Sequence, residues 1–122
     1  MAIERRLNPR IDISGSASLT VVGQTVSVNL LNINLQGVQI EMVQTTFALL
    51  SSKRADDGRY PVSRMTFSEA VENSSQQSMV DCELIFSRRL DQKTYVGGFK
   101  FIAADQAASD TIRALLLKFA KQ

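Results

Sequence analysis

The 122-residue chain contains no histidine, no tryptophan, one cysteine and two prolines. Without histidine, the chain cannot build a Ser-His-Asp triad or a histidine general base. Its single cysteine, Cys82, cannot form an internal disulfide or complete an ordinary zinc site. No nucleophile–base pair or metal cluster is recognisable in the sequence either. We therefore expect a protein that is not an enzyme, has no cofactor and keeps its thiol reduced and buried.

Long apolar runs are also missing from the chain. No run approaches the roughly 18 residues needed to span a bilayer, and the N-terminus lacks a secretion-type hydrophobic stretch. The composition is 44% hydrophobic with a net charge of +2, which predicts one folded domain over residues 1–122. This charge is too small for a general DNA or RNA binder but suits a compact basic site for a small anion. We expect a cytoplasmic protein without membrane insertion.

Alternating apolar residues predict a β-hairpin at the start of the fold. One strand is expected over residues 11–21, with a bulge or bend at Ser14-Gly15, and its partner begins after a tight turn at Gly23-Gln24. At Leu30-Leu31 the apolar phase flips, which places Asn32 and Asn34 together on the opposite face. Gly37 then breaks the run before the next strand, over residues 38–42.

The second half of the chain predicts three more strands and a helix. The strands are expected over residues 62–71, 79–90 and 95–101, separated by polar loops that include residues 51–61 and 72–78. In the second of these strands Val80, Cys82, Leu84 and Phe86 share one apolar phase, while residues 47–50 predict a single buried turn. From residue 105 to 122 apolar residues recur at helical spacing, with Asp105 or Ser109 as the N-cap.

Three arginines precede the first strand. Arg5, Arg6 and Arg10 lie on a segment, residues 1–10, that Pro9 bends into an extended arm. Guanidinium groups bind phosphate and guanine edges through paired hydrogen bonds. The alternative interpretation is that these arginines are ordinary surface charges near a chain end.

The segment from Asn32 to Gly37 is the second candidate. An Asn carboxamide offers a donor and an acceptor to a purine edge, and Gly37 permits a positive φ and a close approach by a ligand. The predicted hairpin returns this bend toward the arm, so the two segments would together form a binding site for an anionic nucleotide. An ordinary Asn-rich turn remains the alternative.

Together these segments resemble the motifs of PilZ domains, which are bacterial receptors for cyclic di-GMP, the second messenger of motility and biofilm control. Residues 6–10 (RLNPR) resemble the family's RxxxR motif, residues 32–37 (NINLQG) its (D/N)xSxxG motif, and residues 98–101 (GFKF) its G-x-x-F ending. The resemblance implies a mainly β fold, a six-stranded antiparallel PilZ-type β-barrel with a C-terminal α-helix. It also implies that ligand occupancy is relayed to a protein effector, and we expect the arm to become ordered on binding.

The resemblance also implies a role for each matching residue. Arg6 and Arg10 would clamp phosphate and guanine, Asn32 would read a guanine edge, and Gly37 would let the loop close over the ligand. An arginine at the position of Arg5 goes with an intercalated ligand dimer in the family. Asn34 replaces the motif serine and would still donate a hydrogen bond to phosphate or base.

Two other functions are compatible with such a barrel. A ligand-independent interaction module would keep the fold but lose affinity because Asn34 is bulkier than serine. A nucleic-acid-binding barrel of the OB type would need aromatic side chains on an exposed strand face. The chain has no tryptophan, and most of its Phe and Tyr residues share phases that predict burial.

Overall fold

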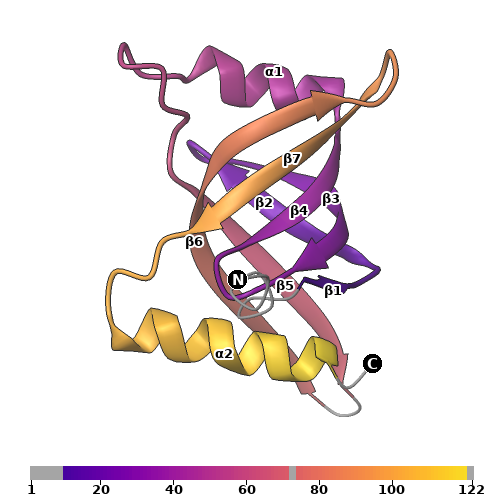
Figure 1. Ribbon diagram of the computed structural model, residues 1–122, viewed down its shortest axis with the longest axis vertical. Helices are drawn as coiled ribbons and strands as arrows, with labels where there is room; N and C mark the ends of the chain where they lie inside the picture. The colour runs from indigo at the N-terminus through magenta and orange to yellow at the C-terminus, as the bar shows by residue number, and fades with distance from the viewer. Residues whose placement is uncertain (1–9, 72–73, 121–122) are drawn as a thin grey trace, which may run out of the picture.

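The structure is a computed structural model that describes residues 10–71 and 74–120 (Figure 1). In this part of the chain seven strands and two helices follow one another, and all strand pairs are antiparallel. Their bounds are β1 (Ile11–Asp12), β2 (Ser16–Val21), β3 (Gln24–Ile33), β4 (Gly37–Val43), α1 (Gln44–Ser52), β5 (Ser63–Val71), β6 (Ser74–Arg89), β7 (Thr94–Phe101) and α2 (Gln106–Ala120).

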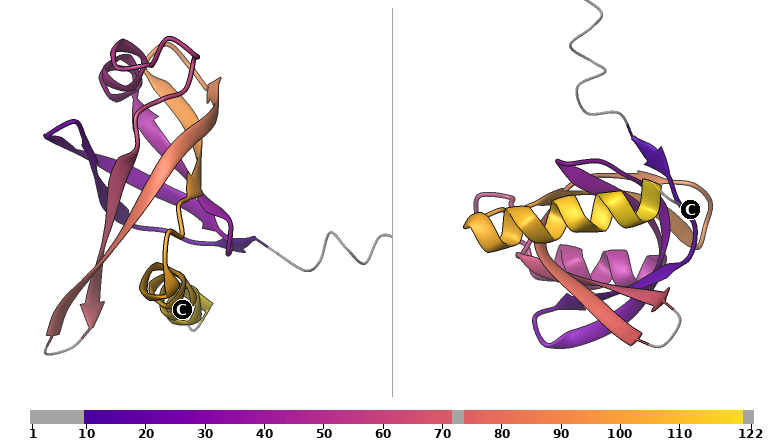
Figure 2. Two further views of the ribbon diagram at one scale, coloured as in Figure 1. Left: turned by 90° about the vertical axis from the view of Figure 1, so that its left-hand side faces the viewer. Right: turned by 90° about the horizontal axis from the view of Figure 1, so that it is seen from below.

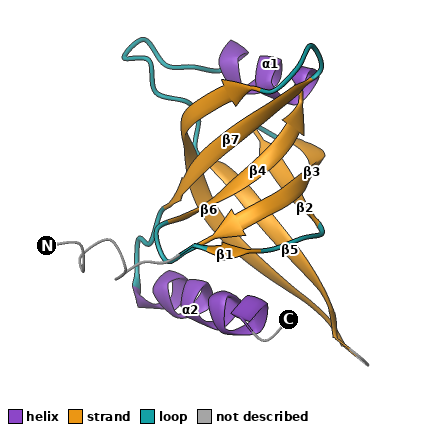
Figure 3. Cartoon of the chain, turned by 45° about the vertical axis from the view of Figure 1, so that its right-hand side comes forward, coloured by secondary structure: helices purple, strands orange, loops and turns teal. Residues whose placement is uncertain are grey.

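Six of the strands close into a barrel. The sheet order is β1-β3-β2-β5-β6-β7-β4, and an additional pairing between β3 and β4 joins the two sides of the sheet. The short β1 pairs with the far end of β3, outside the ring of six (Figure 3). The predicted six-stranded antiparallel barrel with a C-terminal helix is therefore confirmed.

The first predicted strand is divided in two by a bulge. Between β1 and β2, Gly15 adopts a φ of 110°, a backbone conformation that favours glycine, and its carbonyl accepts a hydrogen bond from the Leu30 N–H at 2.9 Å. This confirms the bulge predicted at Ser14-Gly15. The tight turn, however, lies at Val22-Gly23, whose φ angles are 46° and 84°, and Gln24 already belongs to β3.

The inward faces of the strands form the hydrophobic core. The β3–β4 pairing shifts register between Leu30 and Asn32, so the predicted phase flip is a β-bulge that returns Ile33 to the interior. The largest fully buried side chains are Phe67, Phe99, Leu19, Ile33, Ile40, Met42, Leu50, Met65, Leu84, Leu115, Val21 and Val38.

One helix lies at each end of the barrel (Figures 1 and 2). Helix α2 buries Ile112, Leu115 and Phe119, and the Phe119 ring meets Phe67 edge-on, with ring centroids 6.1 Å apart. Asp105 caps this helix, because its Oδ1 accepts the Ala108 N–H at 2.8 Å. No helix in the described residues is long and apolar enough to cross a membrane.

Three sequence predictions about secondary structure were wrong. Helix α1 has nine residues instead of one turn, because it buries only Thr46 and Leu50 and so shows little apolar periodicity. Residues 74–78, predicted as loop, belong to β6, which pairs with β5 as far as Val71↔Ser74. Backbone hydrogen bonds hold that ladder and do not depend on apolar side chains.

The third wrong prediction concerns Phe86. The β6–β7 register shifts between Leu84 and Phe86, so the Phe86 side chain is exposed and does not face the core with Val80, Cys82 and Leu84.

Cys82 is fully buried, and burial raises the pKa of its thiol to about 12, with a smaller contribution from the charge of Asp81. The thiolate is the reactive form of cysteine. We therefore expect no measurable reaction with a disulfide reagent such as DTNB at about pH 8 in the native protein, and one equivalent of rapid reaction in denaturant. Equal rates in the two conditions would show that the thiol is accessible.

Candidate ligand-binding groove

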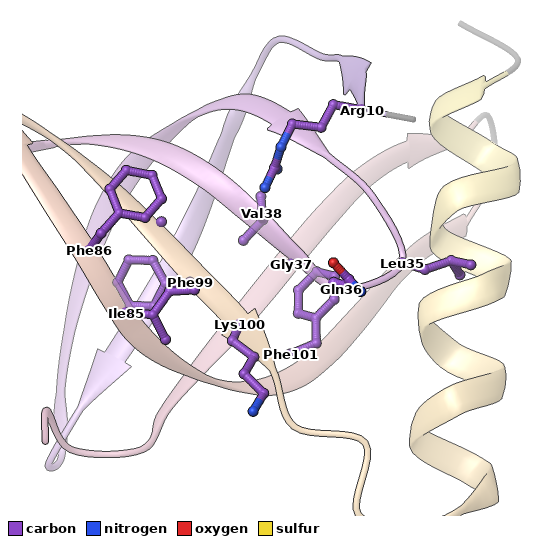
Figure 4. Close-up of a pocket in the computed structure, with 11 residues that line it drawn as sticks. Arg10, Leu35, Gln36, Gly37, Val38, Ile85, Phe86, Phe99, Lys100 and Phe101 are labelled. Atoms are coloured by element: carbon purple, nitrogen blue, oxygen red, sulfur yellow. The ribbon is translucent and has the colours of Figure 1, made fainter. Parts of the chain in front are cut away.

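A groove of about 480 Å³ lies where the β3–β4 turn meets β6 and β7 (Figure 4). Arg10 and Lys100 bring positive charge to it, and the remaining lining is largely apolar. The groove is lined by Arg10, Leu35, Gln36, Gly37, Val38, Ile85, Phe86, Gly98, Phe99, Lys100 and Phe101.

Arg10 is placed at the groove by the pairing of β1 with β3. It directly precedes Ile11, which pairs with Ile33, and Asp12 pairs with Asn32. The Arg10 guanidinium donates a hydrogen bond through Nη1 to Asn32 Oδ1 at 2.8 Å. The structure thus brings the predicted arm and the predicted bend together at Arg10. The other two predicted arginines, Arg5 and Arg6, lie outside the described residues.

Gln39 extends this contact into a chain of three polar side chains. It pairs with Asn32 across β3 and β4, and its Oε1 accepts a hydrogen bond from Asn32 Nδ2 at 2.9 Å. Both ends of the Asn32 carboxamide therefore have partners, and the oxygen is the atom that meets Arg10. The sequence did not indicate Gln39, because its position opposite Asn32 depends on the bulge after Leu30.

Asn34 shapes the bend itself. Strand β3 ends at Ile33, so Asn34 lies in the turn. The prediction that Asn34 lies beside Asn32 on one strand face is therefore wrong. It is 5% exposed, and its Oδ1 accepts the backbone N–H groups of Gln36 at 2.9 Å and Gly37 at 3.0 Å. Its own N–H donates to the Gly37 carbonyl at 2.9 Å. The Asn34 oxygen thus stabilises the turn that ends at the groove.

Gly37 lines the groove and also lies directly against β7. The positive φ angles in the described residues do not include Gly37, so the turn does not use the positive φ that glycine permits. A Cβ at this position would overlap the Phe99 carbonyl of β7. Phe101 N–H donates to the Gln36 carbonyl at 2.8 Å and holds the two backbones together. Glycine therefore permits the close approach of the turn to β7.

Lys100 gives the groove a cation that the sequence analysis did not identify. It pairs with Gly37 across β4 and β7 and with Glu83 across β6 and β7, and its side chain is exposed. Glu83 is engaged by Arg59 through two hydrogen bonds, at 2.7 and 2.9 Å. The hydrogen bond from Arg59 holds the pKa of the Glu83 carboxyl below its ordinary value, against the opposing effect of burial. Arg59 therefore offsets the negative charge of Glu83, the cross-strand partner of Lys100.

The fold and groove define a small antiparallel β-barrel with a cation-bearing groove on its surface. No protein-family model and no curated protein sequence matches this chain. Among solved structures it is similar to the PilZ domain of CeSA from a cellulose-synthesizing bacterium, with a TM-score of 0.64 and 10% identity over 92% of this chain and 98% of that domain.

A second solved structure is the PlzA protein of Borreliella burgdorferi in complex with c-di-GMP. It matches with a TM-score of 0.56 and 10% identity over 93% of this chain, which spans about half (52%) of PlzA. The chain therefore has the fold of a PilZ domain.

The two turn hydrogen bonds make Asn34 a stability determinant. We expect N34A to lower the free energy of unfolding by about 1–3 kcal/mol, because two backbone N–H groups lose their acceptor. N34S is expected to recover part of this loss, since a serine oxygen also accepts hydrogen bonds in turns. Urea unfolding measures both, with N29A at an exposed position of β3 as the control. Wild-type stability of N34A would contradict the role assigned to the side chain.

Proposed function

We propose that this chain binds cyclic di-GMP in the groove and relays occupancy to a partner protein in motility or biofilm control. The observation that carries the proposal is the 2.8 Å hydrogen bond from Arg10 to Asn32, which joins the two segments that resemble the PilZ motifs. The proposed role is that of a cytoplasmic binding module without catalytic activity or a cofactor.

The chemistry of the groove suits a cyclic dinucleotide. Such a ligand carries two negatively charged phosphates and two flat purines, and the groove offers Arg10, Lys100 and an apolar lining. A guanidinium has five N–H donors, and the contact with Asn32 uses one of them. Arg10 would bind phosphate or a guanine edge with its remaining donors, while Asn32 and Gln39 hold the guanidinium in place. Arg6 would complete the clamp.

Two further observations support binding. The PlzA structure, which shares this fold, contains c-di-GMP. Asn34 does not line the groove, and its Oδ1 faces the backbone of its own turn. This favours ligand binding over a ligand-independent module, because the replacement of the motif serine by Asn34 would then cause no steric conflict at Oδ1.

Calorimetric titration with cyclic di-GMP tests the proposal. We expect binding at micromolar concentrations and a loss of about 10- to 150-fold in R10A, because a hydrogen bond to a charged group contributes about 1.5–3 kcal/mol. R64A removes an equal charge from an exposed position of β5 that does not line the groove, and should bind as the wild type does. No heat with the wild type would favour the ligand-independent module.

The same titration tests the role proposed for Arg5. A stoichiometry of two ligands per chain is expected if an intercalated dimer binds, and R5A should reduce it to one. An unchanged stoichiometry in R5A would remove Arg5 from the site while leaving the remaining contacts in place.

Hydrogen exchange tests the proposed relay. If ligand binding orders the arm, the backbone amides of residues 4–10 should exchange more slowly with cyclic di-GMP than without it. Amides of α1, at the far end of the barrel, serve as the internal reference. Equal exchange of residues 4–10 in both states would contradict a relay through the arm.

A further inference from the structure

The groove contains an exposed aromatic ring, that of Phe86, which belongs to neither the RxxxR nor the (D/N)xSxxG motif. Phe86 is 42% exposed and its neighbour Ile85 is 60% exposed, although β6 is paired on both sides, with β5 and with β7. The register shift between Leu84 and Phe86 is what turns Phe86 outward. An aromatic side chain on the outside of a closed barrel exposes apolar surface that the core does not use.

The backbone of β7 is built to receive this ring. Phe86 pairs with Gly98, and a Cβ at position 98 would overlap three atoms of the Phe86 ring. Glycine at this position therefore lets the ring lie directly against the strand. A ring packed in this way is held before any ligand arrives, so binding to it has a smaller ordering cost.

Two positively charged side chains, Arg10 and Lys100, line the same groove as the ring. Gly98 and Lys100 are two residues apart on β7, so they face the same side of the sheet. Arg10 lines the groove as well, from the β1 side (Figure 4). A groove that offers both a flat apolar surface and two cations is complementary to a purine that is attached to phosphate.

We propose that Phe86 is the base-stacking platform of this site, on which one purine of the cyclic dinucleotide lies, with Lys100 beside the adjoining phosphate. This inference rests on the proposed function and adds two residues that belong to neither the RxxxR nor the (D/N)xSxxG motif. Gly98 is a positioning residue, because it acts through the placement of the Phe86 ring.

Substitutions at position 86 separate stacking from general apolar contact. F86Y keeps a ring and should retain affinity, whereas F86L keeps an apolar side chain and should lose it. F86A is expected to weaken cyclic di-GMP binding roughly 5- to 150-fold, the range found for single base–aromatic stacks. L117A removes an apolar side chain that is 64% exposed on α2 and does not line the groove, and should leave affinity unchanged.

A fluorescence readout follows from the absence of tryptophan in the chain. F86W places a single reporter at the platform, and we expect cyclic di-GMP to quench its emission with the same midpoint as the calorimetric titration. Urea unfolding of each variant shows whether any loss of affinity is a loss of folding. Because F86Y and F86W keep a ring, they test the platform even if F86A is unstable.

The outcomes distinguish this inference from the function on which it rests. If the wild type binds no cyclic di-GMP, both are overturned. If the wild type binds and F86L binds equally well, or if the F86W emission does not change at saturation, Phe86 is not the platform and the proposed function stands. Loss in F86L with retention in F86Y supports stacking.

Discussion

The close approach of the β3–β4 turn to β7 is the constraint on which the site depends. Strand β4 pairs with β3 on one side and with β7 on the other, so the first and last hairpins of the chain meet along it. Gly37 permits this approach because any side chain there would overlap the Phe99 carbonyl. Asn34 stabilises the turn from within by accepting two of its N–H groups. The groove lies at the end of the β4–β7 pairing, where Gly37 pairs with Lys100. The pairing of β1 with β3 places Arg10, the residue before β1, at the same groove.

Much of the fold could be predicted because strands and helices with one buried face have periodic sequences. The barrel strands, the bulge at Gly15 and helix α2 all carry such a pattern. Helix α1 and residues 74–78 do not, because α1 buries two side chains and the β5–β6 ladder is held by backbone hydrogen bonds. The resemblance to the PilZ motifs supplied what periodicity cannot, namely which polar residues share a site.

Of the residues predicted for the site, Arg10 and Gly37 line the groove, whereas Asn32 and Asn34 lie beside it. Arg10 and Asn32 meet as expected. The Asn34 oxygen acts on the turn, while Gly37 both lines the groove and permits the close approach of the turn to β7. The sequence prediction placed Phe86 with the buried residues of its strand. The bulge before Phe86 could not be foreseen, because it does not change the alternation of apolar residues up to Leu84. Register shifts explain why the sequence indicated neither the outward position of Phe86 nor the pairing of Gln39 with Asn32.

The central claim is that cyclic di-GMP binds in the groove between the β3–β4 turn and Phe86. Titration of ¹⁵N-labelled protein, followed by amide chemical shifts, tests it most directly. Glycine amides are convenient markers, because Gly37 and Gly98 line the groove while Gly23 and Gly58 do not. The account predicts saturable shifts at Gly37, Gly98 and Lys100, with Gly23 and Gly58 unchanged. Saturable shifts confined to Gly23 and Gly58, or no shifts at all, would contradict it.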